Sequence, residues 1–84
     1  MSKLVRRMEE RDLTHIVKVE DKYYSVESED TIDLGYETKV FECDEYGEIE
    51  SLKILTPLYT EWHINEESMQ DRHNYICEHL EEYL

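Results

Sequence analysis

Long hydrophobic runs are absent from this 84-residue chain, and cysteine, glycine and proline are scarce. No apolar stretch approaches the roughly 18–20 residues of a membrane span, and the amino terminus lacks the apolar core of a signal peptide. Two cysteines are too few for the disulfide framework of a small secreted domain. Two glycines leave no phosphate-binding loop. These absences predict a cytoplasmic protein with reduced thiols, no membrane contact and no cofactor.

Basic side chains are also few, and this deficit is the main functional lead. The chain has 22 acidic and 9 basic residues, for a net charge of −13. Only five of the basic residues, but nineteen of the acidic ones, lie beyond residue 12. Such a surface repels nucleic acid and attracts basic proteins. We therefore expect no direct binding of nucleic acid.

Periodicity of two along most of the chain predicts strands. Residues 15–27 read as a β-hairpin with a turn at 20–22, and 36–42 as a central β-branched and aromatic strand. A second hairpin is expected to return through 49–55, with Gly47 free to take positive φ. Residues 58–64 alternate most cleanly, and this pattern predicts a strand with Trp62 facing the core.

One carboxy-terminal helix is expected from about Glu66 to Tyr83, with Asn65 as its N-cap. Its apolar stripe consists of Met69, His73, Ile76, Leu80 and Tyr83. The predicted fold is α+β: an antiparallel β-meander of four or five strands packed against one C-terminal α-helix. Residues 1–14 are expected to form an N-terminal arm, either helical or frayed, and residues 15–84 a single acidic domain.

Several short stretches form a recognisable pattern along the chain. The most specific is GYETKVF, from Gly35 to Phe41. The others are Lys22 to Val26, Leu58 to Trp62, and Asn65 to Glu67 together with His73. Together they resemble a group of small uncharacterised bacteriophage proteins, in which a strand with a GYETMVF-like sequence precedes an aromatic strand and a histidine-bearing helix. The resemblance covers about residues 20 to 80. It implies a phage origin and a protein that acts in the cytoplasm of an infected bacterium.

Metal binding and catalysis have weak signals. His73 and Cys77 are four residues apart on the predicted helix, and His63, His79 or Cys43 could complete a zinc site only if three separate elements met. No CxxC or HxxxH pair anchors such a site, and we therefore expect no metal and no catalytic residue. Serine or cysteine beside histidine arises by chance in a chain of this composition. The expected protein is not an enzyme.

The acids themselves allow two interpretations. One is a solvated surface that keeps a small protein soluble. The other is mimicry of DNA, because carboxylates on alternate strand residues recur every roughly 6.6–6.8 Å, close to the phosphate spacing along one strand. The acids expected to bind a partner in this way are Glu27, Glu29, Asp30, Asp33, Glu37, Glu42, Asp44, Glu45, Glu48, Glu50, Glu66, Glu67, Glu78, Glu81 and Glu82.

The sequence therefore predicts a phage host-takeover protein that binds and inhibits a basic, nucleic-acid-binding host protein as a DNA mimic. An HU-type nucleoid protein, RNA polymerase and a defence nuclease are all candidate targets. The alternative is a non-catalytic adaptor or assembly module that binds a protein partner through an apolar patch or an exposed sheet edge. A homodimer is compatible with either interpretation.

Overall fold

The computed structural model describes residues 2–7 and 13–84, and it contains one antiparallel sheet and one α-helix. The sheet has five strands in the order β1-β2-β3-β4-β5, which is a simple meander. The short 3-10 helix η1 lies between β4 and β5, and a second one, η2, follows α1. The element bounds are β1 Ser2–Arg7, β2 Leu13–Val19, β3 Lys22–Asp30, β4 Tyr36–Cys43, η1 Lys53–Leu55, β5 Tyr59–His63, α1 Glu66–Glu78 and η2 Leu80–Tyr83.

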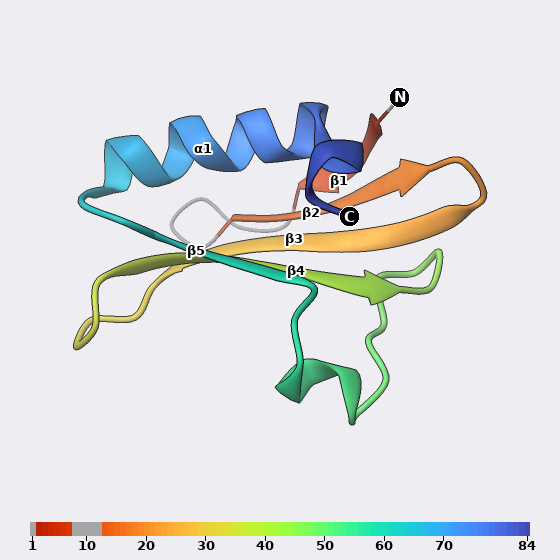
Figure 1. Ribbon diagram of the computed structural model, residues 1–84, viewed down its shortest axis with the longest axis horizontal. Helices are drawn as coiled ribbons and strands as arrows, with labels where there is room; N and C mark the ends of the chain where they lie inside the picture. Colours follow the sequence, from red (N-terminus) through yellow and green to blue (C-terminus); the bar gives the residue numbers. More distant parts are fainter. Residues whose placement is uncertain (1, 8–12) are drawn as a thin grey trace.

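Helix α1 covers one face of the sheet, and η1 lies on the opposite side (Figure 1). The predicted α+β meander with one C-terminal helix is therefore confirmed. The sheet and the helix meet because each has only one apolar side to bury. Within the described part of the chain, no helix is long and apolar enough to cross a membrane.

The core lies between α1 and the strands. Alternate residues of β2, β3 and β4 point toward the helix, where Val17, Val26 and Val40 are fully buried. The helix contributes Met69, His73, Ile76 and Cys77, followed by Leu80 at the start of η2. Asn65 caps α1, because its side chain accepts a hydrogen bond from the backbone N–H of Ser68 at 2.8 Å. The predicted stripe is confirmed, but the α-helix ends at Glu78 and continues only as the short η2.

The sheet face opposite α1, called here the outer face, is covered over only part of its area. Ile16, Ser25 and Phe41 are buried there. Gly47 has a φ of +84° and approaches so closely that a Cβ on it would lie 2.6 Å from Cδ1 of Ile16. The turn at residues 44–47 therefore packs against β2. The part of the outer face nearer β5 is more open.

The amino-terminal arm differs from the expectation of a helical turn. Ser2–Arg7 forms strand β1, which pairs antiparallel with β2 and makes an edge of the sheet. A neighbouring strand supplies the backbone hydrogen bonds that a short isolated helix cannot maintain in water. Residues 8–12, also assigned to the arm, lie outside the described residues.

Two expectations for the second half of the sheet are wrong. Residues 49–55 form no strand; they run through a turn into η1, and Leu52 and Leu55 are exposed. Trp62 is on the outer face with 51% of its surface exposed, so the register of this strand is shifted by one residue from the prediction. Its strand neighbours Glu61 and His63 point toward the helix layer instead, and they form polar contacts there.

Candidate functional site

The exposed edge of β5 is the most unusual surface of the described molecule. Among residues 2–7 and 13–84, strand β5 has only β4 as a neighbour in the sheet, so no described strand pairs with the other side of its backbone. Trp62 lies on its outer face, and Leu58 and Ile64 flank the strand with 52% and 87% of their surface exposed. Large apolar side chains beside an unpaired strand edge are typical of a protein-binding surface.

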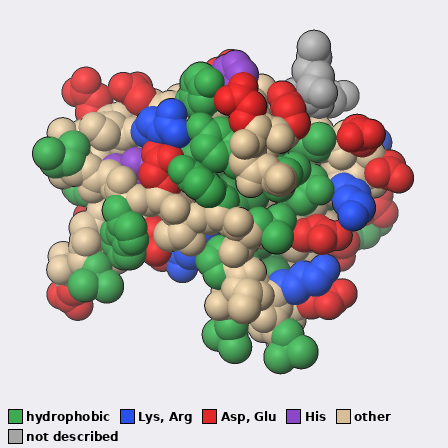
Figure 2. All heavy atoms as spheres, viewed as in Figure 1, with side chains coloured by type: hydrophobic (Ala, Val, Ile, Leu, Met, Phe, Trp, Pro, Cys, Tyr) green, Lys and Arg blue, Asp and Glu red, His purple; other side chains and the backbone are tan. Residues whose placement is uncertain are grey.

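Two neighbouring segments add apolar surface on the same side of the molecule. Ile32 and Leu34, in the turn between β3 and β4, and Leu52 and Leu55, around η1, are each at least 75% exposed. Figure 2 shows hydrophobic side chains projecting at these two positions, below the body of the molecule. The apolar surface is therefore spread over the β5 edge and two projections.

Acidic side chains border the β5 edge. Glu37 pairs with Trp62 across the β4–β5 ladder, and Glu29 pairs with Glu37 across β3–β4. Lys39 lies between them, with its Nζ 3.5 Å from Glu37 and 3.9 Å from Glu29. One cation thus faces two carboxylates, and the outer face near Trp62 keeps a negative charge.

The fifteen acids predicted to bind a partner fall into separate groups. Glu27, Glu29 and Glu37 are half-buried on the outer face, whereas Asp44, Glu45, Glu48 and Glu50 are exposed in the 44–58 segment. Some carboxylates have structural roles: Asp30 accepts a hydrogen bond from the backbone of Ile32, Asp44 accepts two within its turn, and Glu42 lies 3.6 Å from Lys53. Asp33 is exposed in the turn before β4.

The helix acids lie in the other layer of the fold. Their positions are Glu66, Glu67, Glu78, Glu81 and Glu82, all exposed. Because α1 covers the face of the sheet opposite the outer face, these acids and the outer-face acids do not form one row. Figure 2 correspondingly shows acidic side chains dispersed over the visible surface.

A chain of hydrogen bonds runs beneath the helix and was not expected from the sequence. Nδ1 of His15 is 2.6 Å from Nε2 of His73, and Nδ1 of His73 is 2.6 Å from Oγ of Ser28. Ser28 contacts Oγ1 of Thr38 at 2.5 Å, and Thr38 contacts Nε2 of His63 at 2.7 Å. This path of hydrogen bonds joins residues of β2, β3, β4 and β5 with one residue of α1. His63 is the residue that β5 contributes.

Glu61 terminates this path at the surface of the helix layer. Its carboxylate accepts two hydrogen bonds from Arg72, at 2.7 and 3.0 Å, and a third from the hydroxyl of Tyr59 at 2.6 Å. Nδ1 of His63 lies 3.5 Å from the same carboxylate. The hydrogen bonds from Arg72 hold the pKa of Glu61 below its ordinary value, and burial lowers the pKa of His63. At neutral pH the pair is therefore a carboxylate beside a neutral imidazole.

The buried path offers little for catalysis. Ser28 and His73 have the spacing of a nucleophile and a base, but Ser28 is 1% exposed and cannot contact a substrate. Burial raises the pKa of Cys43 to about 11 and that of Cys77 to about 12. Both therefore carry thiols at neutral pH, and a thiol is a poor nucleophile.

Three side chains in this region could hold a metal. The donor atoms of His15, His73 and Cys77 all lie within 4.8 Å of one another. The sequence indicated His73 and Cys77 by their helical spacing, whereas the other suggested partners, His63, His79 and Cys43, are not part of this group. The sequence could have indicated His15 as well. It alternates with Val17 and Val19 along the strand, and all three therefore lie on the core face of β2.

Comparison of the chain with protein-family models, with curated proteins and with solved structures finds no match. The similarity to phage proteins therefore stays a prediction.

Proposed function

We propose that this chain is a non-catalytic binding module that takes up an extended, basic segment of a partner protein along the free edge of β5. The observation that carries the proposal is the orientation of β5, whose polar residues Glu61 and His63 face the helix while Trp62 faces outward. A shift of one residue in the register of β5 would have buried Trp62 and turned the polar side chains of the strand outward.

The edge has the two features that β-strand addition requires. An unpaired strand offers backbone N–H and C=O groups to an incoming strand, and side chains beside it supply specificity. Natural edge strands are usually protected by lysine, proline, an inward-pointing charge or a covering loop. Residues 59–63 contain neither lysine nor proline, and their inward-pointing charge, Glu61, is paired with Arg72. Covering a large apolar side chain completely contributes about 1.5–3 kcal/mol, and about half of that is available where half of the side chain is exposed. Leu58, Trp62 and Ile64 together can therefore anchor a partner segment.

The charge of the surface selects the kind of partner. With two carboxylates near Trp62 for one lysine, and a net charge of −13 overall, a basic segment is favoured over an acidic one. Electrostatic attraction should increase the rate of association, and apolar contacts should slow dissociation. Rising salt is expected to weaken the complex in part but not to abolish it.

The second candidate is a DNA mimic that inhibits a basic nucleic-acid-binding protein of an infected bacterium. It is supported by the exposed acids of the 44–58 segment, where Glu45, Glu48 and Glu50 carry charge without a described basic partner. A mimic competes with duplex DNA for its target and loses affinity by orders of magnitude between about 50 and 200 mM salt. These two properties distinguish it from a partner that docks on β5.

A comparison of matched variants tests the proposed site. Trp62→Thr with Ile64→Thr removes apolar surface at the β5 edge, whereas Leu52→Thr with Leu55→Thr removes similarly exposed apolar side chains near η1. Each immobilised variant is used to capture proteins from bacterial lysate at 50 and 200 mM salt, and captured proteins are then tested for displacement from duplex DNA. We expect the wild type and the η1 variant to retain the same protein, and the β5 variant to retain at least tenfold less.

Two results would argue against β5 as the binding site. Equal retention of the same protein by the β5 variant would show that the partner docks elsewhere. Loss of retention at 200 mM salt together with displacement from DNA would favour the mimic instead.

A further inference from the structure

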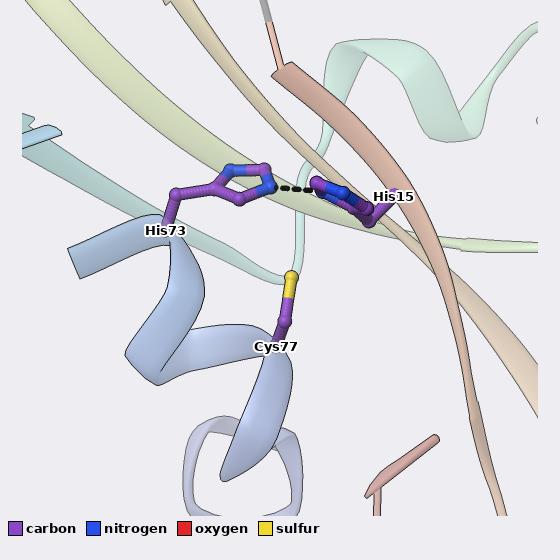
Figure 3. Close-up of side chains that lie close together, drawn as sticks. All are labelled: His15, His73 and Cys77. Atoms are coloured by element: carbon purple, nitrogen blue, oxygen red, sulfur yellow. Dashed lines mark hydrogen bonds between the residues drawn. The ribbon is translucent and has the colours of Figure 1, made fainter. Parts of the chain in front are cut away.

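The buried group of His15, His73 and Cys77 has the composition of a zinc site. His73 and Cys77 are one helical turn apart on the inner side of α1, and His15 lies on β2 beneath them. All three residues are buried. Figure 3 shows the Cys77 side chain pointing from the helix toward the two imidazole rings. Two imidazoles and a thiolate are the kind of ligands that Zn²⁺ prefers, whereas Mg²⁺ and Ca²⁺ prefer oxygen ligands.

The hydrogen-bond chain determines which nitrogen of His73 carries a proton. The Glu61 carboxylate, fixed by Arg72, lies 3.5 Å from Nδ1 of His63 and favours the tautomer that carries the single proton of the neutral ring on that nitrogen, with Nε2 as an acceptor. Thr38 then donates to His63, and it must accept from Ser28 because a hydroxyl has only one proton. Each bond thus sets the direction of the next.

The last bond of the chain leaves a lone pair at the centre of the group. Ser28 donates to Thr38 and therefore accepts from Nδ1–H of His73. Nε2 of His73 is then unprotonated and faces Nδ1 of His15. Metal-binding histidines have this arrangement, with the remote ring N–H held by an oxygen that orients the ring. Ser28 holds that position for His73.

The separations of the donor atoms are compatible with coordination after small side-chain rotations. Zn–N bonds of about 2.0–2.1 Å and a Zn–S bond of about 2.3 Å require donors roughly 3.3–3.7 Å apart. The two histidine nitrogens are 2.6 Å apart and must separate, while all three donors already lie within 4.8 Å. A surface cavity of about 200 Å³, lined by Leu13, His15, Gln70 and Asn74, borders one of the three residues, His15, and is large enough to hold water.

We propose that His15 Nδ1, His73 Nε2 and Cys77 Sγ form a three-ligand Zn²⁺ site with one position left for water. Binding of the ion releases the thiol proton of Cys77 to solvent, and the proton on Nδ1 of His15 moves to Nε2 of the same ring. One proton is therefore released for each zinc bound. Without the ion, the two histidines hydrogen-bond to each other.

Cobalt is the probe that tests this site. Co²⁺ bound by a thiolate gives a charge-transfer absorption, and this absorption disappears when Zn²⁺ displaces the Co²⁺. The full chain, freed of metal with a chelator, is titrated with Co²⁺ and then with Zn²⁺. We expect one equivalent to saturate the absorption, and Zn²⁺ to raise the melting temperature. Cys77→Ala should lose both responses, whereas Cys43→Ala, which changes the half-buried other cysteine, should keep both.

Two further variants separate ligation from folding. His15→Ala should weaken Co²⁺ binding and reduce the absorption intensity. Ser28→Ala should keep the absorption but lower the affinity about 10–100-fold, as loss of a group that orients a ligand does in other sites. The proposal is overturned if the wild type gives no one-to-one thiolate absorption, or if Cys77→Ala retains it while folded by circular dichroism.

Discussion

Glu61 connects the stability of the fold to pH. It accepts three side-chain hydrogen bonds, and those from Arg72 are the main reason that its pKa is lowered. A carboxylate with a lowered folded-state pKa stabilises the fold above its ordinary value of 4.5, and this stabilisation is lost as pH falls through the folded-state pKa. His63 acts in the same direction at higher pH, because burial lowers its pKa below 6.5 and protonation then opposes folding.

We therefore predict that acidification reduces stability in two stages. The melting temperature should begin to fall below about pH 6.5, where the unfolded chain takes up a proton at His63, and fall further below about pH 4.5 through Glu61. Thermal unfolding followed by circular dichroism from pH 8 to pH 3.5 measures both stages. His63→Gln should reduce the upper stage and Glu61→Gln the lower one. Identical pH profiles for the three proteins would show that neither group is responsible.

Met69 and Trp62 provide a second test at the level of single residues. Met69 is fully buried on the sheet-facing side of α1, so Met69→Ala should cost about 2–5 kcal/mol of unfolding free energy by leaving a cavity. Trp62 is half-exposed on the outer face, and Trp62→Ala should cost about 1 kcal/mol or less. Urea denaturation measures both values. A larger loss for Trp62 than for Met69 would mean that the strand register described for β5 is wrong.

At the scale of secondary structure, the contact of β5 with α1 depends on Arg72. Its guanidinium bonds to Glu61 through two parallel hydrogen bonds and to the hydroxyl of Tyr83 at 2.7 Å. Arg72 also lies over the ring of Tyr75, 5.1 Å from its centroid. One side chain thus joins the edge strand, the helix and η2. The apolar side chains of β5 can remain outward because polar contacts hold its inner side.

Replacement of Arg72 should weaken this contact without unfolding the chain. Arg72→Ala leaves the Glu61 carboxylate without its charged partner and should cost about 1–3 kcal/mol, nearer the lower figure because the pair is partly exposed. Arg72→Lys should recover only part of the loss, since an ammonium group cannot form two parallel bonds. Lys22→Ala, at the exposed first residue of β3, is the control. Urea midpoints that are equal for Arg72→Ala and Lys22→Ala would contradict this role.

The elements that could be predicted from the sequence are those whose pattern and packing agree. The first hairpin, β4 and the capped helix all have alternating or helical apolar residues that do face the core. Strand β5 could not be placed correctly, because its apolar residues face outward and its polar residues face the helix. Strand β1 has a charged sequence that a short arm would also have, and it is a strand only because β2 pairs with it.

The candidate sites could likewise be predicted only in part from the sequence. The spacing of His73 and Cys77 was visible in the sequence, but the approach of His15 from β2 depends on the packing of α1 against the sheet. The hydrogen-bond path through Ser28, Thr38 and His63 depends on the register of three strands. No local pattern contains that information, because the residues are 10 to 45 positions apart.

For the molecule as a whole, the distribution of charge limits the ways in which it can bind. The helix acids and the outer-face acids occupy opposite layers, so a partner that contacts one group does not contact the other. The apolar β5 edge and the carboxylates of Glu29 and Glu37 are on the same side. A basic segment added to β5 would use both. Electrostatic attraction over the rest of the surface would assist its approach.

Amide hydrogen exchange of the complex tests the central claim most directly. The captured partner, or its basic segment, is added to the full chain, and exchange is measured for residues 59–63. If an extended segment pairs with β5, the backbone N–H groups on its free edge become hydrogen-bonded, and their exchange should slow by at least tenfold, with a smaller change in α1. Unchanged exchange in β5, together with protection centred on residues 44–50 or on the helix acids, would contradict binding at this edge.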